Sequence, residues 1–213
     1  MAVTAARVGA LAKGTDLTPV LLHRARENAA IAGVEVGFRE GDAEALSYHD
    51  AFDVVLSRFG HMFTPRPEVA TARMLRVLKP GGRIAFSTCP SEHTMSKSFG
   101  LLGRNISQPP PGVPTLATPP SWGDPRVVRE RLGDVVTELR FDRGVAPSPA
   151  LSLRHAPASM GTSFGPPMKI LQDLEQRPDR VAQVRSEMLD LFEEVFAGNC
   201  LQQHFLMSRA SKK

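Results

Sequence analysis

The sequence lacks any long apolar run, and this absence limits where the protein can work. No segment approaches the roughly 18 consecutive apolar residues that a membrane-spanning helix requires. Residues 1–13 also lack the basic start, apolar stretch and small-residue cleavage site of a secretory signal. We therefore expect no membrane span and a cytoplasmic location.

Cysteines and aromatic residues are scarce too, and clusters of positive charge are missing. Cys89 and Cys200 lie in apolar surroundings and belong to no Cys-x-x-Cys or Cys/His cluster, which predicts two reduced core thiols and no metal site. The net charge is +4 and Arg outnumbers Lys by 20 to 6, but the arginines alternate with acidic residues. A nucleic-acid surface needs clustered cations with aromatic side chains among them, so we expect no nucleic-acid partner.

What is present is the composition of one globular α/β domain. At 213 residues, 42% hydrophobic and 23% charged, the chain predicts a single domain over 1–213 with a proline-rich cap at 90–125. Alternating strands and helices predict a doubly wound, mainly parallel sheet with an antiparallel hairpin at one edge. The predicted strands are 11–16, 34–39, 52–57, 83–88, 135–143 and 201–208, with a shorter one at 150–154. The predicted helices are 2–8, 18–32, 68–78, 125–132 and 168–196, the last interrupted near Pro178.

Two acidic residues follow neighbouring predicted strands. Asp16 ends one strand and Asp42 follows the next, so both carboxylates should project from the same edge of the sheet. Such a pair suits an adenosine, because one acid can accept from both ribose hydroxyls and the other from the adenine amino group. Two simpler interpretations remain: both residues are helix caps or loop acids, or the first belongs to a nicotinamide site.

Four motifs in this order resemble the class I S-adenosylmethionine-dependent methyltransferases, of the ubiquinone/menaquinone-biosynthesis-like kind that act on small molecules. They are Thr15-Asp16-Leu17-Thr18-Pro19, Glu40-Gly41-Asp42-Ala43-Glu44-Ala45-Leu46, Phe52-Asp53-Val54-Val55-Leu56-Ser57 and Arg76-Val77-Leu78-Lys79-Pro80-Gly81-Gly82-Arg83. The resemblance implies a Rossmann-like fold, S-adenosylmethionine as cofactor and a small-molecule methyl acceptor.

The resemblance also implies a role for individual residues. Asp16 would hold the ribose hydroxyls and Leu17 would pack on the adenine. Asp42 would meet the adenine amino group, with the Ala43 backbone amide on the ring, and residues Ser57 to Phe59 would face the methionine part of the cofactor.

The chain departs from this family at its start. The family's first strand and its acidic Gly-x-Gly-x-Gly loop would precede Ala2, so we expect a sheet that lacks its first strand and a cofactor site that lacks one wall. The strands on either side of the gap would then pair directly or remain exposed.

The remaining choice concerns activity. His61, beyond the strand at 52–57, is the best-placed titratable residue for a general base, although a loop histidine without a role fits it as well. The main hypothesis is methyl transfer. A non-catalytic remnant or binding module is the alternative that the missing loop favours. A nicotinamide-dependent oxidoreductase would need Gly-x-Gly-x-x-Gly, which does not occur.

Overall fold

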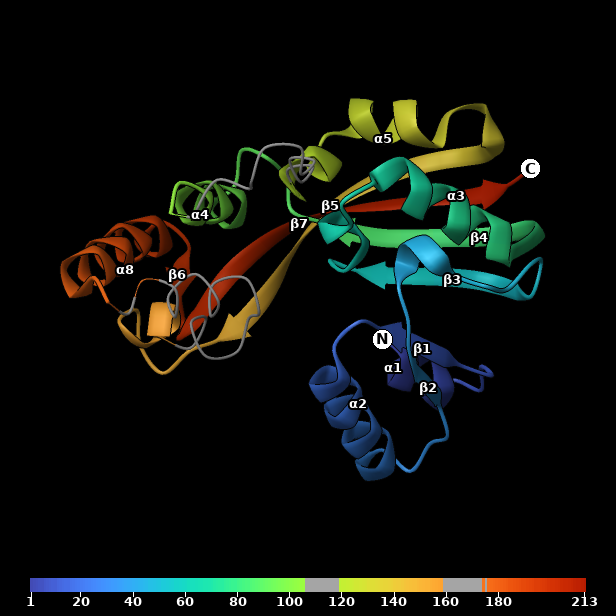
Figure 1. The fold of residues 1–213 in the computed structure, drawn as a ribbon, viewed down its shortest axis with the longest axis horizontal. Coiled ribbons are helices and arrows are strands. Elements are labelled where there is room, and N and C mark those ends of the chain that lie inside the picture. The colour runs from blue at the N-terminus through green and yellow to red at the C-terminus, as the bar shows by residue number, and fades with distance from the viewer. Residues whose placement is uncertain (106–118, 159–173, 175) are drawn as a thin grey trace. The chain divides into compact units, whose positions relative to one another are not determined.

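Strands and helices alternate along the chain, and the strands form two sheets (Figure 1). The computed structural model describes residues 1–105, 119–158, 174 and 176–213. Its strands are β1 (Lys13–Asp16), β2 (Gly37–Glu40), β3 (Phe52–Arg58), β4 (Leu78–Thr88), β5 (Val136–Pro149), β6 (Phe196–Ala197) and β7 (Cys200–Lys212). Its α-helices are α1 (Ala2–Arg7), α2 (Pro19–Ile31), α3 (Pro67–Val77), α4 (Thr94–Gly103), α5 (Pro125–Leu132) and α8 (Pro178–Glu193). Short 3-10 helices are η1 (Ala43–Ala45), η2 (His61–Phe63), η3 (Pro119–Gly123) and η4 (Gly133–Val135).

Local sequence signals account for most element boundaries. Helix α2 begins with Pro19 at its first position, where the missing N–H costs nothing, and the chain leaves the helix at Gly33, whose φ is +63°. Helix α8 begins at Pro178, where the sequence predicted a break. The predicted helical residues 168–173 lie outside the described residues. Residues 150–154 form bends and turns in place of the predicted short strand.

The sheet is interrupted where the sequence predicted a missing strand. β1 and β2 pair in parallel as a sheet of two strands, and the larger sheet has the order β3-β4-β7-β5, with β6 paired to β7. In Figure 1 the arrowheads of β5 and β7 point in opposite directions, as expected for an antiparallel edge hairpin. No pairing joins β1 to β3 among the described residues, so both strands have an edge without a neighbour.

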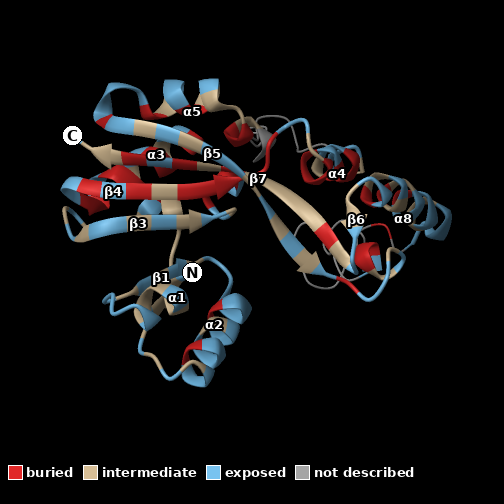
Figure 2. Ribbon diagram, turned by 180° about the vertical axis from the view of Figure 1, so that it is seen from behind, coloured by how far each residue is buried: buried red, intermediate tan, exposed pale blue. Residues whose placement is uncertain are grey.

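The interruption changes the burial of β3. The sequence predicted a strand covered on both faces, yet β3 is half-buried to exposed along its length, with Val54 38% and Leu56 45% exposed. β4, which has β3 on one side and β7 on the other, buries Ile84 and Phe86 almost completely (Figure 2). The difference follows from position in the sheet, because an edge strand has one neighbour and a central strand has two.

The chain forms two compact units, and the single domain over 1–213 stays a prediction. The first unit comprises Met1–Phe86, Arg129–Arg140 and Ser208–Lys213, and the second comprises Ser87–Val128 and Phe141–Met207. Within the predicted cap at 90–125, residues 90–105 and 119–125 belong to the second unit, and residues 106–118 lie outside the described residues. The first unit is built around α3 and β4, with Ala70, Met74, Leu78 and Phe86 buried. No helix in the described part of the chain is long and apolar enough to cross a membrane.

Candidate functional site

The ends of β1 and β2 lie next to each other. The parallel register pairs Asp16 with Glu40, and the Gly41 N–H donates a hydrogen bond of 3.0 Å to the Asp16 carbonyl. Gly41 is required for this close approach, because a Cβ there would lie 2.8 Å from the Thr15 methyl group. The register therefore brings Asp16 and Asp42 to one edge of the small sheet, as the sequence predicted.

Asp16 holds the turn into α2 and still has acceptor capacity. Its Oδ1 accepts a hydrogen bond of 2.9 Å from the N–H of Thr18, the N-cap of α2, which is the local contact of a loop acid, one of the simpler interpretations. Among the described residues nothing donates to its Oδ2. The next side chain, Leu17, is 63% exposed. This site thus presents a carboxylate oxygen beside an apolar surface, the two features that a ribose and an adenine ring require.

Asp42 plays the same local role one strand further along. Its Oδ1 accepts a hydrogen bond of 2.8 Å from the Glu44 N–H and so caps the short helix η1. Ala43 is the first residue of η1, and an N–H at that position has no carbonyl within its own helix to bind. The capped turn presents a carboxylate and a backbone amide, the pair of groups that the resemblance assigns to the adenine.

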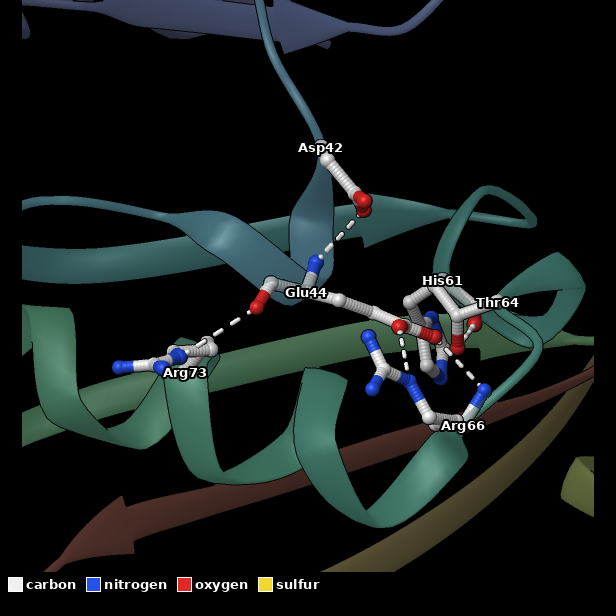
Figure 3. A network of polar contacts seen from close by, with 6 residues as sticks. All are labelled: Asp42, Glu44, His61, Thr64, Arg66 and Arg73. Atoms are coloured by element: carbon white, nitrogen blue, oxygen red, sulfur yellow. Dashed lines mark hydrogen bonds and ion pairs between the residues drawn. The ribbon is translucent and has the colours of Figure 1, made fainter.

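Glu44, a buried acid that the sequence analysis did not assign, lies next to Asp42 in a network of polar contacts (Figure 3). The Glu44 side chain is only 4% exposed, and its two oxygens accept from Arg66, at 2.6 Å from the backbone N–H and 2.8 Å from Nε. Its carbonyl accepts a bond of 3.3 Å from Arg73 Nε. The only sequence feature that could have pointed to Glu44 is its position between Ala43 and Ala45, where an acid follows the strand end in an otherwise apolar turn.

Ser57 lies near the end of β3, and Phe59 and His61 follow the strand in a tightly bonded loop. The Ser57 hydroxyl accepts from the His61 N–H at 3.1 Å and lies 3.1 Å from its Nδ1. Phe59 has a φ of +59°, a left-handed conformation that is uncommon for a bulky residue. The Thr64 hydroxyl donates a bond of 2.8 Å to the His61 carbonyl.

Burial determines the protonation of His61. The residue is 4% exposed and its ring centroid lies 4.5 Å from that of Phe86. Burial in this apolar surrounding, with a smaller contribution from the positive charge of Arg131, lowers the pKa of His61 to about 3. The imidazole is therefore neutral near pH 7 and is a weak base. The ring contacts both Ser57 and Phe86, and its role as a general base stays a prediction.

A cavity of the first unit lies away from these residues. It measures about 640 Å³ and is lined by α3, by residues near η4 and by the end of β7. Asp16, Asp42 and Ser57 do not line it. In the second unit, Trp122 is 1% exposed and Met95 is 8% exposed, so these side chains serve the core of the predicted cap.

The chain is similar to known methyltransferases in sequence. Residues 1–86 match the family described as "Methyltransferase domain". An uncharacterized protein of Mycobacterium tuberculosis is 32% identical over 218 residues, covering 100% of this chain and 77% of the relative. The demethylmenaquinone methyltransferase of Thermus thermophilus is 40% identical over 97 residues, which are 45% of this chain and 43% of that enzyme.

Solved structures show the same fold at low sequence identity. A putative methyltransferase from Bacillus halodurans has a TM-score of 0.55 at 16% identity, covering 94% of this chain and 82% of that one. A protein whose structure is described under "Conversion of a Disulfide Bond into a Thioacetal Group during Echinomycin Biosynthesis" has a TM-score of 0.59 at 15% identity, covering 100% of this chain and 70% of the other. With the methyltransferase-domain match over residues 1–86 and the similarity to the demethylmenaquinone methyltransferase, the chain belongs to the class I S-adenosylmethionine-dependent methyltransferases.

Proposed function

We propose that this protein transfers a methyl group from S-adenosylmethionine to a small-molecule acceptor, with the adenosine part held at the ends of β1 and β2. The observation that carries the proposal is the register of these strands, which sets Asp16 against Glu40 and joins Gly41 to the Asp16 carbonyl. Asp16 and Asp42, at the ends of adjacent parallel strands, provide one acceptor for the ribose hydroxyls and one, a strand further along, for the adenine amino group.

The residues present fit the cofactor at three points. Asp16 Oδ2 would accept from the ribose hydroxyls, the exposed Leu17 side chain would cover the adenine, and Asp42 with Ala43 would read the adenine edge. The loop after β3 would face the methionine part, with Ser57 and the left-handed Phe59 nearest to it.

The chemistry needs little from the protein beyond alignment. S-adenosylmethionine supplies an electrophilic methyl group on a sulfonium, and an oxygen, nitrogen or activated carbon of the acceptor attacks it in line. The chain's own contribution is to orient the cofactor and to accept a proton from the acceptor where that is required. Ser57 and His61 form the polar pair nearest to the end of β3, with the Ser57 hydroxyl 3.1 Å from Nδ1.

Titration followed by NMR tests the proposal. The ligands are S-adenosylmethionine and a nicotinamide dinucleotide, each added to the 213-residue chain. We expect weak binding of S-adenosylmethionine, because residues 1–14 contain no Gly-x-Gly to offer backbone donors to its methionine part. The amides of Leu17 and Ala43 should shift with S-adenosylmethionine and stay in place with the dinucleotide. Equal shifts with both ligands would favour the oxidoreductase, and shifts with neither would favour the non-catalytic alternative.

A further inference from the structure

We propose that Glu44 is a positioning residue for the cofactor: its buried carboxylate fixes the Asp42–Ala45 turn against the loop after β3, so that cofactor affinity depends on a side chain that does not touch the cofactor. This inference rests on the proposed function, because it concerns the turn that would read the adenine. The sequence analysis gave Glu44 no role, and this inference gives it one.

The first argument is how completely Glu44 is bonded. Its N–H donates to Asp42 Oδ1 at 2.8 Å, and its carbonyl accepts from Arg73 Nε at 3.3 Å. Its carboxylate accepts from both the backbone N–H and the Nε of Arg66. Every polar group of this residue is thus bonded to a group of the same unit, and the 4% exposure of its side chain keeps the carboxylate from a ligand and gives it a fixed position.

The second argument is where the bonded groups come from. Arg66 immediately precedes α3, and Arg73 lies within it, so Glu44 attaches the turn after β2 to the helix after β3. This attachment matters because no strand pairing joins β1 or β2 to β3 among the described residues. Glu44 thus links the Asp42 turn to Arg66, which ends the loop after β3, through its carboxylate, and to Arg73 within α3 through its carbonyl.

The third argument is the direction of the bonds, visible in Figure 3. Asp42 accepts from the Glu44 N–H, so the orientation of the Asp42 carboxylate depends on where Glu44 lies. Displacing the Glu44 side chain would therefore move the acceptor predicted for the adenine. The Arg66 side chain is 65% exposed whereas that of Glu44 is 4% exposed, so the buried acid, rather than the arginine, is the fixed point of the pair.

The decisive variant is Glu44→Gln. The amide keeps the size of the side chain and one acceptor oxygen for the Arg66 N–H, but its NH2 group then faces the Arg66 guanidinium, donor against donor. We expect adenosine and S-adenosylmethionine to bind about tenfold more weakly, as for the loss of one charge-assisted hydrogen bond. Both ligands should lose the same factor, since they share the adenosine part.

Two further variants separate positioning from general destabilisation. Arg66→Lys keeps the backbone donor and a positive charge, so its loss of affinity should be smaller than that of Glu44→Gln. Glu27→Gln is the matched control, because Glu27 is an acid in an exposed pair with Arg24 on α2 and lies outside the site. We expect its affinities to equal those of the wild type.

Hydrogen exchange without ligand supplies the independent readout. In Glu44→Gln the amides of residues 44–46 and of Arg66 should exchange faster, while those of Ile84 and Phe86 in β4 keep their wild-type rates. Uniformly faster exchange, or unchanged exchange in the turn, would overturn the proposal. So would a looser turn with wild-type adenosine affinity. If the wild type bound neither ligand, the proposed function would fail, and the exchange rates alone would decide whether Glu44 fixes the turn.

Discussion

At the scale of single residues, Asp16 carries the clearest test of the site. Asp16→Ala should weaken S-adenosylmethionine binding by about 1–3 kcal/mol, because ribose donors would lose their acceptor. Asp16→Asn should lose less, since one side-chain oxygen remains to cap Thr18. Calorimetry or NMR titration provides the measurement. The control is Asp53→Asn, because Asp53 is an exposed acid on β3 that pairs with Lys79 of β4. Wild-type affinity in a folded Asp16→Ala variant would contradict the ribose assignment.

A second residue-scale prediction concerns pH. Burial lowers the pKa of His61 to about 3, whereas the unfolded chain binds this proton near its ordinary value of 6.5. Between these two values the unfolded state therefore holds more protons, so stability is complete above about pH 6.5 and falls as the pH drops towards 3. In the middle of that window the loss from this one group is about 1.4 kcal/mol per pH unit.

Unfolding in denaturant at a series of pH values measures this loss. His61→Asn places an amide near the position of Nδ1 and removes the titration, so its free energy of unfolding should fall less steeply with acidity than that of the wild type. His49→Asn, at a histidine that is largely exposed, should follow the wild-type curve. Parallel curves for all three proteins would show that His61 is not buried as described.

At the scale of elements, the tight passage of β2 beside β1 makes Gly41 a specific test. A Cβ at this position would lie 2.8 Å from the Thr15 methyl group, so Gly41→Ala should destabilise the small sheet by about 1 kcal/mol, the lower end of the cost of overpacking. Thr15→Ser removes that methyl group, and the double variant should recover most of the loss. A double variant no more stable than Gly41→Ala alone would mean that this contact does not limit the approach of the strands.

Elements of this fold differ in how far the sequence predicts them. Helix α2 and its entry were predictable because Thr18-Pro19 and Gly33 are local signals. The exposure of β3 was not, because its apolar run is typical of a covered strand and only the pairing order makes it an edge. The placement of Asp16 and Asp42 at neighbouring strand ends was predictable from the strand pattern, whereas Glu44 was missed because its partners, Arg66 and Arg73, lie 22 and 29 residues away.

At the scale of the whole molecule, the interrupted sheet bears on stability. β1 and β3 each have an edge without a strand partner among the described residues, and β3 exposes Val54 and Leu56 on such an edge. A strand between β1 and β3 would bury apolar side chains worth roughly 1.5–3 kcal/mol each, against a whole-domain margin of about 5–15 kcal/mol. An apolar edge is also a template for pairing with another copy of the chain.

We therefore expect the 213-residue chain to melt over a broad range and to aggregate on heating. Val54→Lys and Leu56→Lys should reduce light scattering during the melt, because a charged edge disfavours pairing between chains. Ile31→Lys is the control: Ile31 is more exposed, at 85%, but ends a helix and offers no strand edge, so this change should leave aggregation as it is. Equal protection by all three would indicate a general effect of charge. A sharp, reversible wild-type melt would instead show that the two sheets form a cooperative structure without a strand between them.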